Sequence, residues 1–355
     1  MTITTSVAVV IVVFAFVLPR IAPYGAAWGL VRSMSTGAAL LLAAATVLNV
    51  LTYTGPWLAA LPGLRWRRSF ELTMATTALA NVAPLGGAFA AGAGYGMLRE
   101  WGWSRQEATR ATLITGLATQ VLNVGFPVVA LLLLTLSGED GGIYSRVLPW
   151  AVIVLVVALA PLVLTMASNR TARWVGDGWH KLARPLLARL GSSARDTDGD
   201  ALERFRSQSL ALLRLRWFAI VWTNIANLVT AWLVLAIAMH GVGISTHDVG
   251  WHEGFAAFAL SRLLVAIPLT PGGLGIVELG LTSALTRFGG AEAAVVAAVL
   301  VYRALTMVPT TIAGGIAAFT WRRGQGTGQS YRRWDSELAG TDVAPVNHEN
   351  RLPSP

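Results

Sequence analysis

The residues Pro268-Leu-Thr-Pro-Gly-Gly-Leu-Gly-Ile-Val-Glu278 interrupt an apolar stretch, 253–288, that is otherwise long enough to cross a lipid bilayer. Pro271 fixes φ and removes a backbone N–H, and the glycines after it permit a tight turn. Each half is then about 12–16 residues, or roughly 18–24 Å of helix, which is too short for a hydrocarbon core of ~30 Å. The pattern predicts a re-entrant hairpin, in which two half-length helices enter and leave the membrane on one side. Two kinked or short spans are the alternative.

A second apolar stretch, 70–98, is interrupted by Asn81-Val-Ala-Pro-Leu-Gly-Gly87. It predicts a second hairpin, and such backbone is tolerated at membrane depth only where it lines a polar cavity or is buried in protein. Apart from the hairpins, the long apolar blocks predict six full spans, at about 3–18, 35–60, 108–136, 147–168, 214–240 and 292–320.

The composition agrees with a membrane protein. Of the 355 residues, 54% are hydrophobic and 13% are charged, whereas about 25% of a soluble domain is charged. The blocks do not alternate as barrel strands do, so the predicted fold is an all-α polytopic membrane helix bundle. The chain has no cysteine, which excludes disulfides and thiolate chemistry. The net charge of +9 lies in loops between apolar blocks and indicates contact with anionic lipid headgroups rather than with nucleic acid.

The distribution of charge between loops predicts the orientation. The loops at 61–69 and 169–216 are rich in arginine, whereas those at 137–146 and 241–253 carry acidic residues. Because basic loops stay in the cytoplasm, we expect a multi-pass protein of the cell inner (plasma) membrane with both termini cytoplasmic; Arg20 and Arg32 disagree with this assignment. The two hairpins then enter from opposite sides, which is the inverted repeat of many secondary transporters.

This organisation divides the chain into one transmembrane domain, a linker and a tail. The expected domain covers residues 1–320, and the tail is expected to be disordered and cytoplasmic. The ranges are 35–168 for the first half, 169–213 for the cytoplasmic linker, 214–320 for the second half and 321–355 for the tail.

Two arginines fall inside predicted membrane segments, Arg262 and Arg303. A charge near the bilayer centre costs at least about 2.5 kcal/mol, so each must face water or the protein interior and have a partner. Glu278 is the only acidic residue predicted inside the membrane in this half. One interpretation is a structural Arg–Glu pair; the other is a phosphate clamp, because a guanidinium holds phosphate oxygens in a bidentate manner.

The helix after the second interruption is expected to begin near Gly275, with free N–H groups and a positive dipole end that favour an anion. Glu278 lies in its first turn and could instead cap those N–H groups. Asn81 and Asn123 are further polar groups that could face the same cavity. The candidate substrate-binding residues are Asn81, Pro84, Gly86, Gly87, Arg262, Pro271, Gly272, Gly273, Gly275, Glu278 and Arg303.

The predicted exterior loop contains His240, His247 and His252. Their spacing differs from helical metal-ligand patterns such as His-Glu-x-x-His. We therefore expect an interfacial loop, with no metal site, no cofactor and no catalytic residue.

The run Ile267–Glu278, together with Arg303 and Pro309, resembles the lysylphosphatidylglycerol synthase transmembrane region, the flippase-like (YbhN-type) family. The run Asn81–Gly87, followed by Tyr95-Gly-Met-Leu-Arg99, resembles that family's other hallmark. The glutamate of a Gly-Glu-x-x-Arg pattern found in many relatives is absent here. The resemblance covers nearly all of residues 1–320 and implies movement of anionic or modified lipids, polyprenyl-linked ones included, between leaflets.

The leading hypothesis is thus a lipid flippase or transporter that binds membrane lipids through their anionic headgroups; self-association into a homo-oligomer stays open. Some relatives carry a cytosolic aminoacyltransferase domain, but only 35 residues follow Thr320, so we expect no aminoacyltransferase activity. The alternatives are an intramembrane lipid-modifying enzyme that uses Glu278 with His247 and His252, and a scaffold for a membrane glycosyltransferase or synthase.

Overall fold

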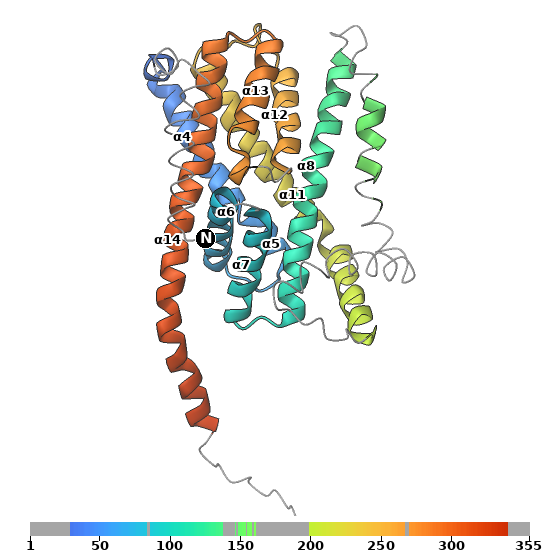
Figure 1. Ribbon diagram of the computed structural model, residues 1–355, viewed down its shortest axis with the longest axis vertical. Coiled ribbons are helices and arrows are strands. Elements are labelled where there is room, and N and C mark those ends of the chain that lie inside the picture. The colour runs from blue at the N-terminus through green and yellow to red at the C-terminus, as the bar shows by residue number, and fades with distance from the viewer. Residues whose placement is uncertain are drawn as a thin grey trace, which may run out of the picture.

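The computed structural model describes residues 29–83, 86–137, 199–266 and 270–339, together with short helical pieces between 146 and 160. Over these residues the chain is helical and contains no strand, which confirms the all-α class (Figure 1).

Four helices are long and apolar enough to cross a membrane: Thr36–Ala60, Arg105–Ser137, Leu212–Gly241 and Glu292–Trp321. The first combines α4 (Thr36–Thr52) and α5 (Gly55–Ala60), the second is α8, and the others belong to α11 (Gly199–Gly241) and α14 (Glu292–Ala339). They confirm the predicted spans 35–60, 108–136, 214–240 and 292–320. The span expected at 3–18 lies outside the described residues, and the span expected at 147–168 is described only in short helical pieces, at 148–153, 155–157 and 160.

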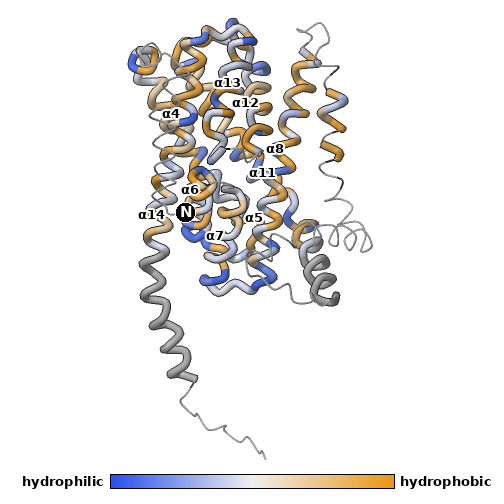
Figure 2. The backbone as a smooth tube through the Cα atoms, in the orientation of Figure 1, coloured by the Kyte–Doolittle hydropathy of each residue, from blue (hydrophilic) through white to orange (hydrophobic). Residues whose placement is uncertain are grey.

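The long helices expose apolar side chains on their outer faces. Leu40 of α4, Leu136 of α8 and Ile316 of α14 are 67%, 74% and 60% exposed, and hydrophobic residues extend along most of these helices (Figure 2). Apolar surface of this extent is what a hydrocarbon environment favours. The protein is an integral membrane protein by this criterion.

Two pairs of short helices lie between the long ones. α6 (Trp66–Val82) and α7 (Gly86–Glu100) form the first pair, and α12 (Trp251–Ala266) and α13 (Ile276–Arg287) form the second. Figure 1 shows α6 and α7 in the lower half of the bundle, and α12 and α13 in the upper half. At 1.5 Å per residue, none of the four exceeds about 26 Å. Both apolar stretches are therefore interrupted where the sequence predicts.

The second interruption contains a short 3-10 turn, η2 (Pro271–Gly273), followed by Gly275. Gly272, Gly273 and Gly275 have φ values of 59°, 69° and 83°, a left-handed region that residues with a Cβ rarely adopt. Gly272 also packs closely on α6, because a Cβ at this position would lie 3.2 Å from both the Cα and the carbonyl oxygen of Asn81. The two interruptions thus meet inside the bundle.

The apolar core is divided between the two helix pairs. One cluster includes Leu235, Phe258, Leu281 and Val295, and involves α11 to α14. The other includes Trp57, Leu72, Met74, Leu98 and Ala108, and involves α5 to α8. Each short pair is therefore buried against long helices.

The last described helix runs into the segment 321–355, and the expected disorder of this tail stays a prediction. α14 continues to Ala339, because no proline interrupts it after Pro309 and extending an existing helix needs no new nucleation. Residues 340–355 lie outside the described residues.

Helix α14 packs against α6 through Gly314, where a Cβ would clash with the backbone carbonyl of Met74. We expect Gly314→Ala to lower the melting temperature of the detergent-purified protein, because overpacking costs about 1–3 kcal/mol. Gly315→Ala is the matched control, since nothing lies within 4 Å of its Cβ position and alanine has the higher helix propensity. Equal melting temperatures for the two variants would contradict this packing.

Candidate functional site

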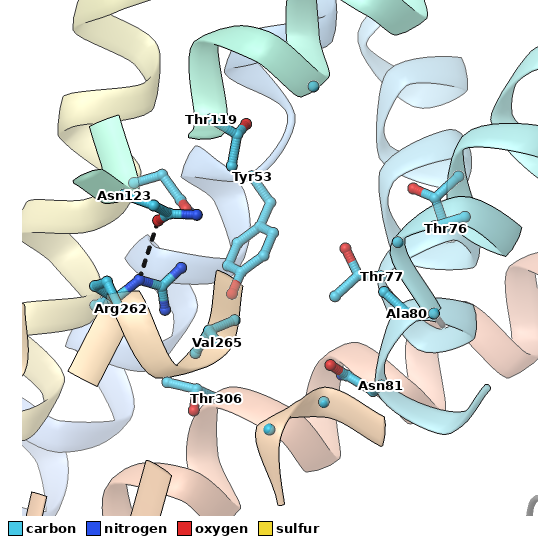
Figure 3. Close-up of a pocket in the computed structure, with 18 of the residues that line it drawn as sticks. Tyr53, Thr76, Thr77, Ala80, Asn81, Thr119, Asn123, Arg262, Val265 and Thr306 are labelled. Atoms are coloured by element: carbon cyan, nitrogen blue, oxygen red, sulfur yellow. Dashed lines mark hydrogen bonds between the residues drawn. The ribbon is translucent and has the colours of Figure 1, made fainter. Parts of the chain in front are cut away.

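A cavity of about 620 Å³ lies where the two interruptions meet. Its walls come from α6, α7, α8, α11, α12, η2 and α14, together with Tyr53 after α4 and Trp57 of α5. Figure 3 shows Thr76, Thr77 and Asn81 of α6 across the space from Asn123 of α8 and Arg262 of α12. The volume is within the ~300–1,000 Å³ typical of ligand sites.

The first cationic group in this cavity is Arg262. Its Nε donates a hydrogen bond to Oδ1 of Asn123 at 3.3 Å (Figure 3). Among the described residues, no carboxylate lies within 4.0 Å of this guanidinium. A guanidinium carries five N–H donors, so Arg262 keeps both its charge and further donors for the cavity.

The second cationic group, Arg303, is paired with Glu278. Its Nε lies 2.6 Å from Oε1 of Glu278, and both side chains are buried. A further nitrogen, Nη2, donates to the carbonyl oxygen of Gly272 at 2.8 Å. The other carboxylate oxygen, Oε2, accepts a hydrogen bond from the N–H of Gly275 at 2.7 Å. Glu278 therefore forms an ion pair with Arg303 and also caps the start of α13. The sequence analysis gave these two structural roles as alternatives to binding of a ligand.

The rest of the cavity wall is rich in hydroxyl and amide groups. Thr76 and Thr115 donate their hydroxyls to the carbonyl oxygens of Leu72 and Ala111, each four residues earlier in its helix. These hydroxyls keep lone pairs that can accept a hydrogen bond from a ligand. The polar lining residues on α6, α8, α11 and α14 are Thr76, Thr77, Asn81, Thr112, Thr115, Thr119, Gln120, Asn123, Asn227 and Thr306.

Two residues of the cavity wall, Thr112 and Thr270, have a buried hydroxyl oxygen without a hydrogen-bond partner among the described residues. Leaving a buried polar atom unsatisfied costs about 1–3 kcal/mol.

The structure brings most of the predicted site residues to this cavity. Those that line it are Asn81, Gly86, Gly87, Arg262, Gly272, Gly273 and Arg303. Three others, Pro271, Gly275 and Glu278, support the turn and do not line the cavity. The N–H of Gly275 is bound by Glu278, and the anion site expected at this helix start stays a prediction. Pro84 lies outside the described residues.

Sequence reasoning missed Tyr53 and the threonines of the wall. The signal for the threonines was available, because Thr77 and Asn81 of α6, and Thr112, Thr115 and Thr119 of α8, recur at helical spacing. Polar residues at three- and four-residue intervals on an apolar helix mark one face. That face is the one that lines the cavity.

The loop between α11 and α12 is organised by its own hydrogen bonds. Asp248 accepts from the side chain and the backbone N–H of Ser245 at 2.7 and 2.9 Å, and these bonds hold the pKa of its carboxyl below the usual value. His247 of this loop and His252 in the first turn of α12 do not line the cavity. Within the described ranges, no three metal-binding side chains cluster.

The buried Arg303–Glu278 pair predicts strong coupling between the two side chains. We expect Glu278→Gln and Arg303→Gln each to lower stability by about 3–5 kcal/mol, because each leaves a buried charge without its partner. In the double variant no charge is left unpaired, so its loss should be much smaller than the sum of the single losses. Thermal unfolding of the three variants in detergent measures this coupling, and additive losses would contradict it.

Comparison with known families gives one match, to the family described as the lysylphosphatidylglycerol synthase TM region, over residues 3–314. A comparison with curated proteins found none that matches. The matched region includes every predicted site residue and every residue that lines the cavity. The resemblance inferred from the two interruptions is thereby confirmed, and the chain belongs to the family of the lysylphosphatidylglycerol synthase TM region.

Proposed function

We propose that the protein is a lipid transporter of the flippase type, which moves an anionic or modified lipid, polyprenyl-linked lipids included, between the two leaflets. The observation that carries this proposal is Arg262, a guanidinium that faces a cavity in the middle of the bundle without a carboxylate partner among the described residues. Such a cation is costly inside a membrane unless an anion or water compensates it. A lipid phosphate supplies that compensation.

The arrangement of the short helices supports transport. In the proposal, α6–α7 and α12–α13 are re-entrant hairpins that enter from opposite sides, and the two halves form an inverted repeat. None of these four helices is long enough to cross a bilayer alone, and each pair packs in its own apolar cluster. The interruptions of the two pairs meet at the cavity. Sites between inverted repeats near the midplane allow alternating access from either leaflet.

The loops support one orientation. Arg65 and Arg68 lie beside Trp103, so the α5–α6 and α7–α8 loops are neighbours, and the acidic α11–α12 loop lies at the opposite end of the bundle (Figure 1). In our proposal the arginine-rich end faces the cytoplasm of a cell membrane, as do both termini.

The proposal assigns movement of lipid and no aminoacyl transfer to this chain. Glu278, the acidic residue that an enzyme mechanism would use, is held by Arg303 and by the N–H of Gly275. A carboxylate fixed in this way supports the turn rather than exchanging protons with a substrate.

The role of Arg262 can be tested by lipid transfer in proteoliposomes with a fluorescent anionic phospholipid. We expect Arg262→Gln to reduce the transfer rate about 10- to 100-fold, since a hydrogen bond to a charged group contributes about 1.5–3 kcal/mol. Its melting temperature should stay near that of the wild type, because the substitution breaks no ion pair. Arg67→Gln is the control, because Arg67 pairs only with Glu71 at the surface. Unchanged transfer by Arg262→Gln would refute the headgroup role.

The proposed topology can be tested by labelling, because the chain has no native cysteine. Three single-cysteine variants, Arg67→Cys, Gln106→Cys and Thr246→Cys, each place one thiol at an exposed position. These positions lie at the start of α6, at the start of α8 and in the α11–α12 loop. We expect a membrane-impermeant maleimide to label the first two only from the cytoplasmic side and Thr246→Cys only from the outside. Labelling of positions 67 and 106 from different sides would contradict the hairpin formed by α6 and α7.

A further inference from the structure

A second pocket, of about 340 Å³, lies at the arginine-rich end of the bundle. It is lined by Gly63, Leu64 and Arg65 before α6, by Arg68 in the first turn of α6, and by Trp103 of the α7–α8 loop. The two loops are in contact here, because a Cβ at Gly63 would lie 3.5 Å from Cη2 of Trp103. Among the described residues, none lines both this loop pocket and the central cavity, so the two spaces are separate.

Two guanidinium groups of the loop pocket carry charges that the described residues do not neutralise. Within that part of the chain, no carboxylate lies within 4.0 Å of Arg65 or Arg68. The carboxylate of Glu71, one turn further along α6, pairs instead with Arg67 at 3.1 Å. That of Glu107 caps the start of its own helix, α8. Because like charges that share a pocket repel, an anion between them is favoured.

The walls of the loop pocket are held in place before any ligand binds. The guanidinium of Arg68 lies over the ring of Trp101, with its Cζ 5.4 Å from the ring centre. This contact restricts the side chain and leaves its N–H donors for oxygen acceptors. Arg99 donates a hydrogen bond to the carbonyl oxygen of Trp103 and so fixes the opposite wall. Donors that are already ordered lose less conformational entropy when they bind.

The tryptophans around the loop pocket indicate its depth. Trp66, Trp101 and Trp103 all lie at this end of the α6–α7 pair, and Trp66 is 52% exposed. Tryptophan is enriched where a bilayer meets water, at the level of the lipid headgroups. At that level guanidinium groups bind phosphate oxygens through charge-assisted hydrogen bonds, and the membrane itself supplies phosphate groups.

From the two uncompensated guanidinium groups and the interfacial position we propose that the loop pocket binds a phosphate group of net negative charge. An acidic phospholipid of the surrounding membrane and a free phosphate share this chemistry. The bound phosphate contacts Arg65 and Arg68 beside the wall formed by Trp103, and so links the α5–α6 loop to the α7–α8 loop. It therefore fastens together the two outer ends of the first helix pair. This site is independent of the proposed function, because it uses no residue of the central cavity.

Thermal stabilisation of the detergent-purified full chain tests the site in an Arg262→Gln background, which removes the free guanidinium of the central cavity. The probes are inorganic phosphate and phosphatidylglycerol in mixed micelles, with zwitterionic phosphatidylcholine for comparison. We expect Arg65→Gln and Arg68→Gln each to weaken phosphatidylglycerol binding about fivefold, the effect of one exposed charge-assisted contact. Arg67→Gln is the matched control, because it removes the same charge from a neighbouring position that does not line the pocket.

The two probes distinguish the sources of the phosphate. Stabilisation by both, weakened in Arg65→Gln and Arg68→Gln, supports a site for any accessible phosphate, whereas stabilisation by phosphatidylglycerol alone supports a lipid headgroup site. No stabilisation by either probe would overturn the proposal. Equal stabilisation by phosphatidylcholine, or an equal loss of affinity in Arg67→Gln, would overturn it as well.

Chemical protection locates the bound phosphate in the wild-type protein. Phenylglyoxal modifies exposed arginines, and tandem mass spectrometry reads Arg65, Arg67 and Arg68 separately. We expect phosphatidylglycerol to slow the modification of Arg65 and Arg68 several-fold relative to phosphatidylcholine. The rate at Arg67 should be unchanged, because its side chain is 89% exposed and pairs with Glu71. Equal protection of all three arginines would indicate general attraction to a charged surface and would overturn the site.

Discussion

A charged side chain inside a hydrocarbon layer must be compensated, and this constraint organises the centre of the protein. Arg303 of α14 and Arg262 of α12 lie in the same region, but their charges are compensated in different ways. Arg303 is neutralised by Glu278 and bound to the carbonyl of Gly272. Arg262 has one amide contact and an open cavity. A pair of this kind stabilises a structure, whereas a cation without a partner favours a ligand.

The broken helices create the backbone groups that the Arg303–Glu278 pair satisfies. Ending a helix inside the bundle leaves backbone N–H and C=O groups that need hydrogen-bond partners. Here the carboxylate accepts from the N–H of Gly275, and the guanidinium donates to the carbonyl of Gly272. The same ion pair thus neutralises its own charges and completes the turn between α12 and α13. Its removal would disturb the fold and the cavity together.

Much of the fold followed from local features of the sequence. Long apolar blocks predicted four spans that the structure contains, and the Pro/Gly runs near 84 and 271 predicted both interruptions. The site was predicted less completely. Which arginine pairs with Glu278 depends on how α14 faces α13, and sequence alone left this open. The threonines were missed because a hydroxyl that bonds to its own helix adds little polarity to an apolar block, so their helical spacing is a weak signal beside the charged residues.

One arginine of the cavity is paired within the protein and the other faces the open space, so the cavity has a fixed turn and also a positive charge for a ligand. If both arginines were paired with carboxylates, the cavity would have no net attraction for a phosphate. If neither were paired, two guanidinium groups would repel across a low-dielectric space and the broken backbone would lack its partners. With Glu278 bound to Arg303, Arg262 is the one guanidinium lining the cavity that has no carboxylate partner among the described residues. In our proposal, one anionic phosphate compensates that charge.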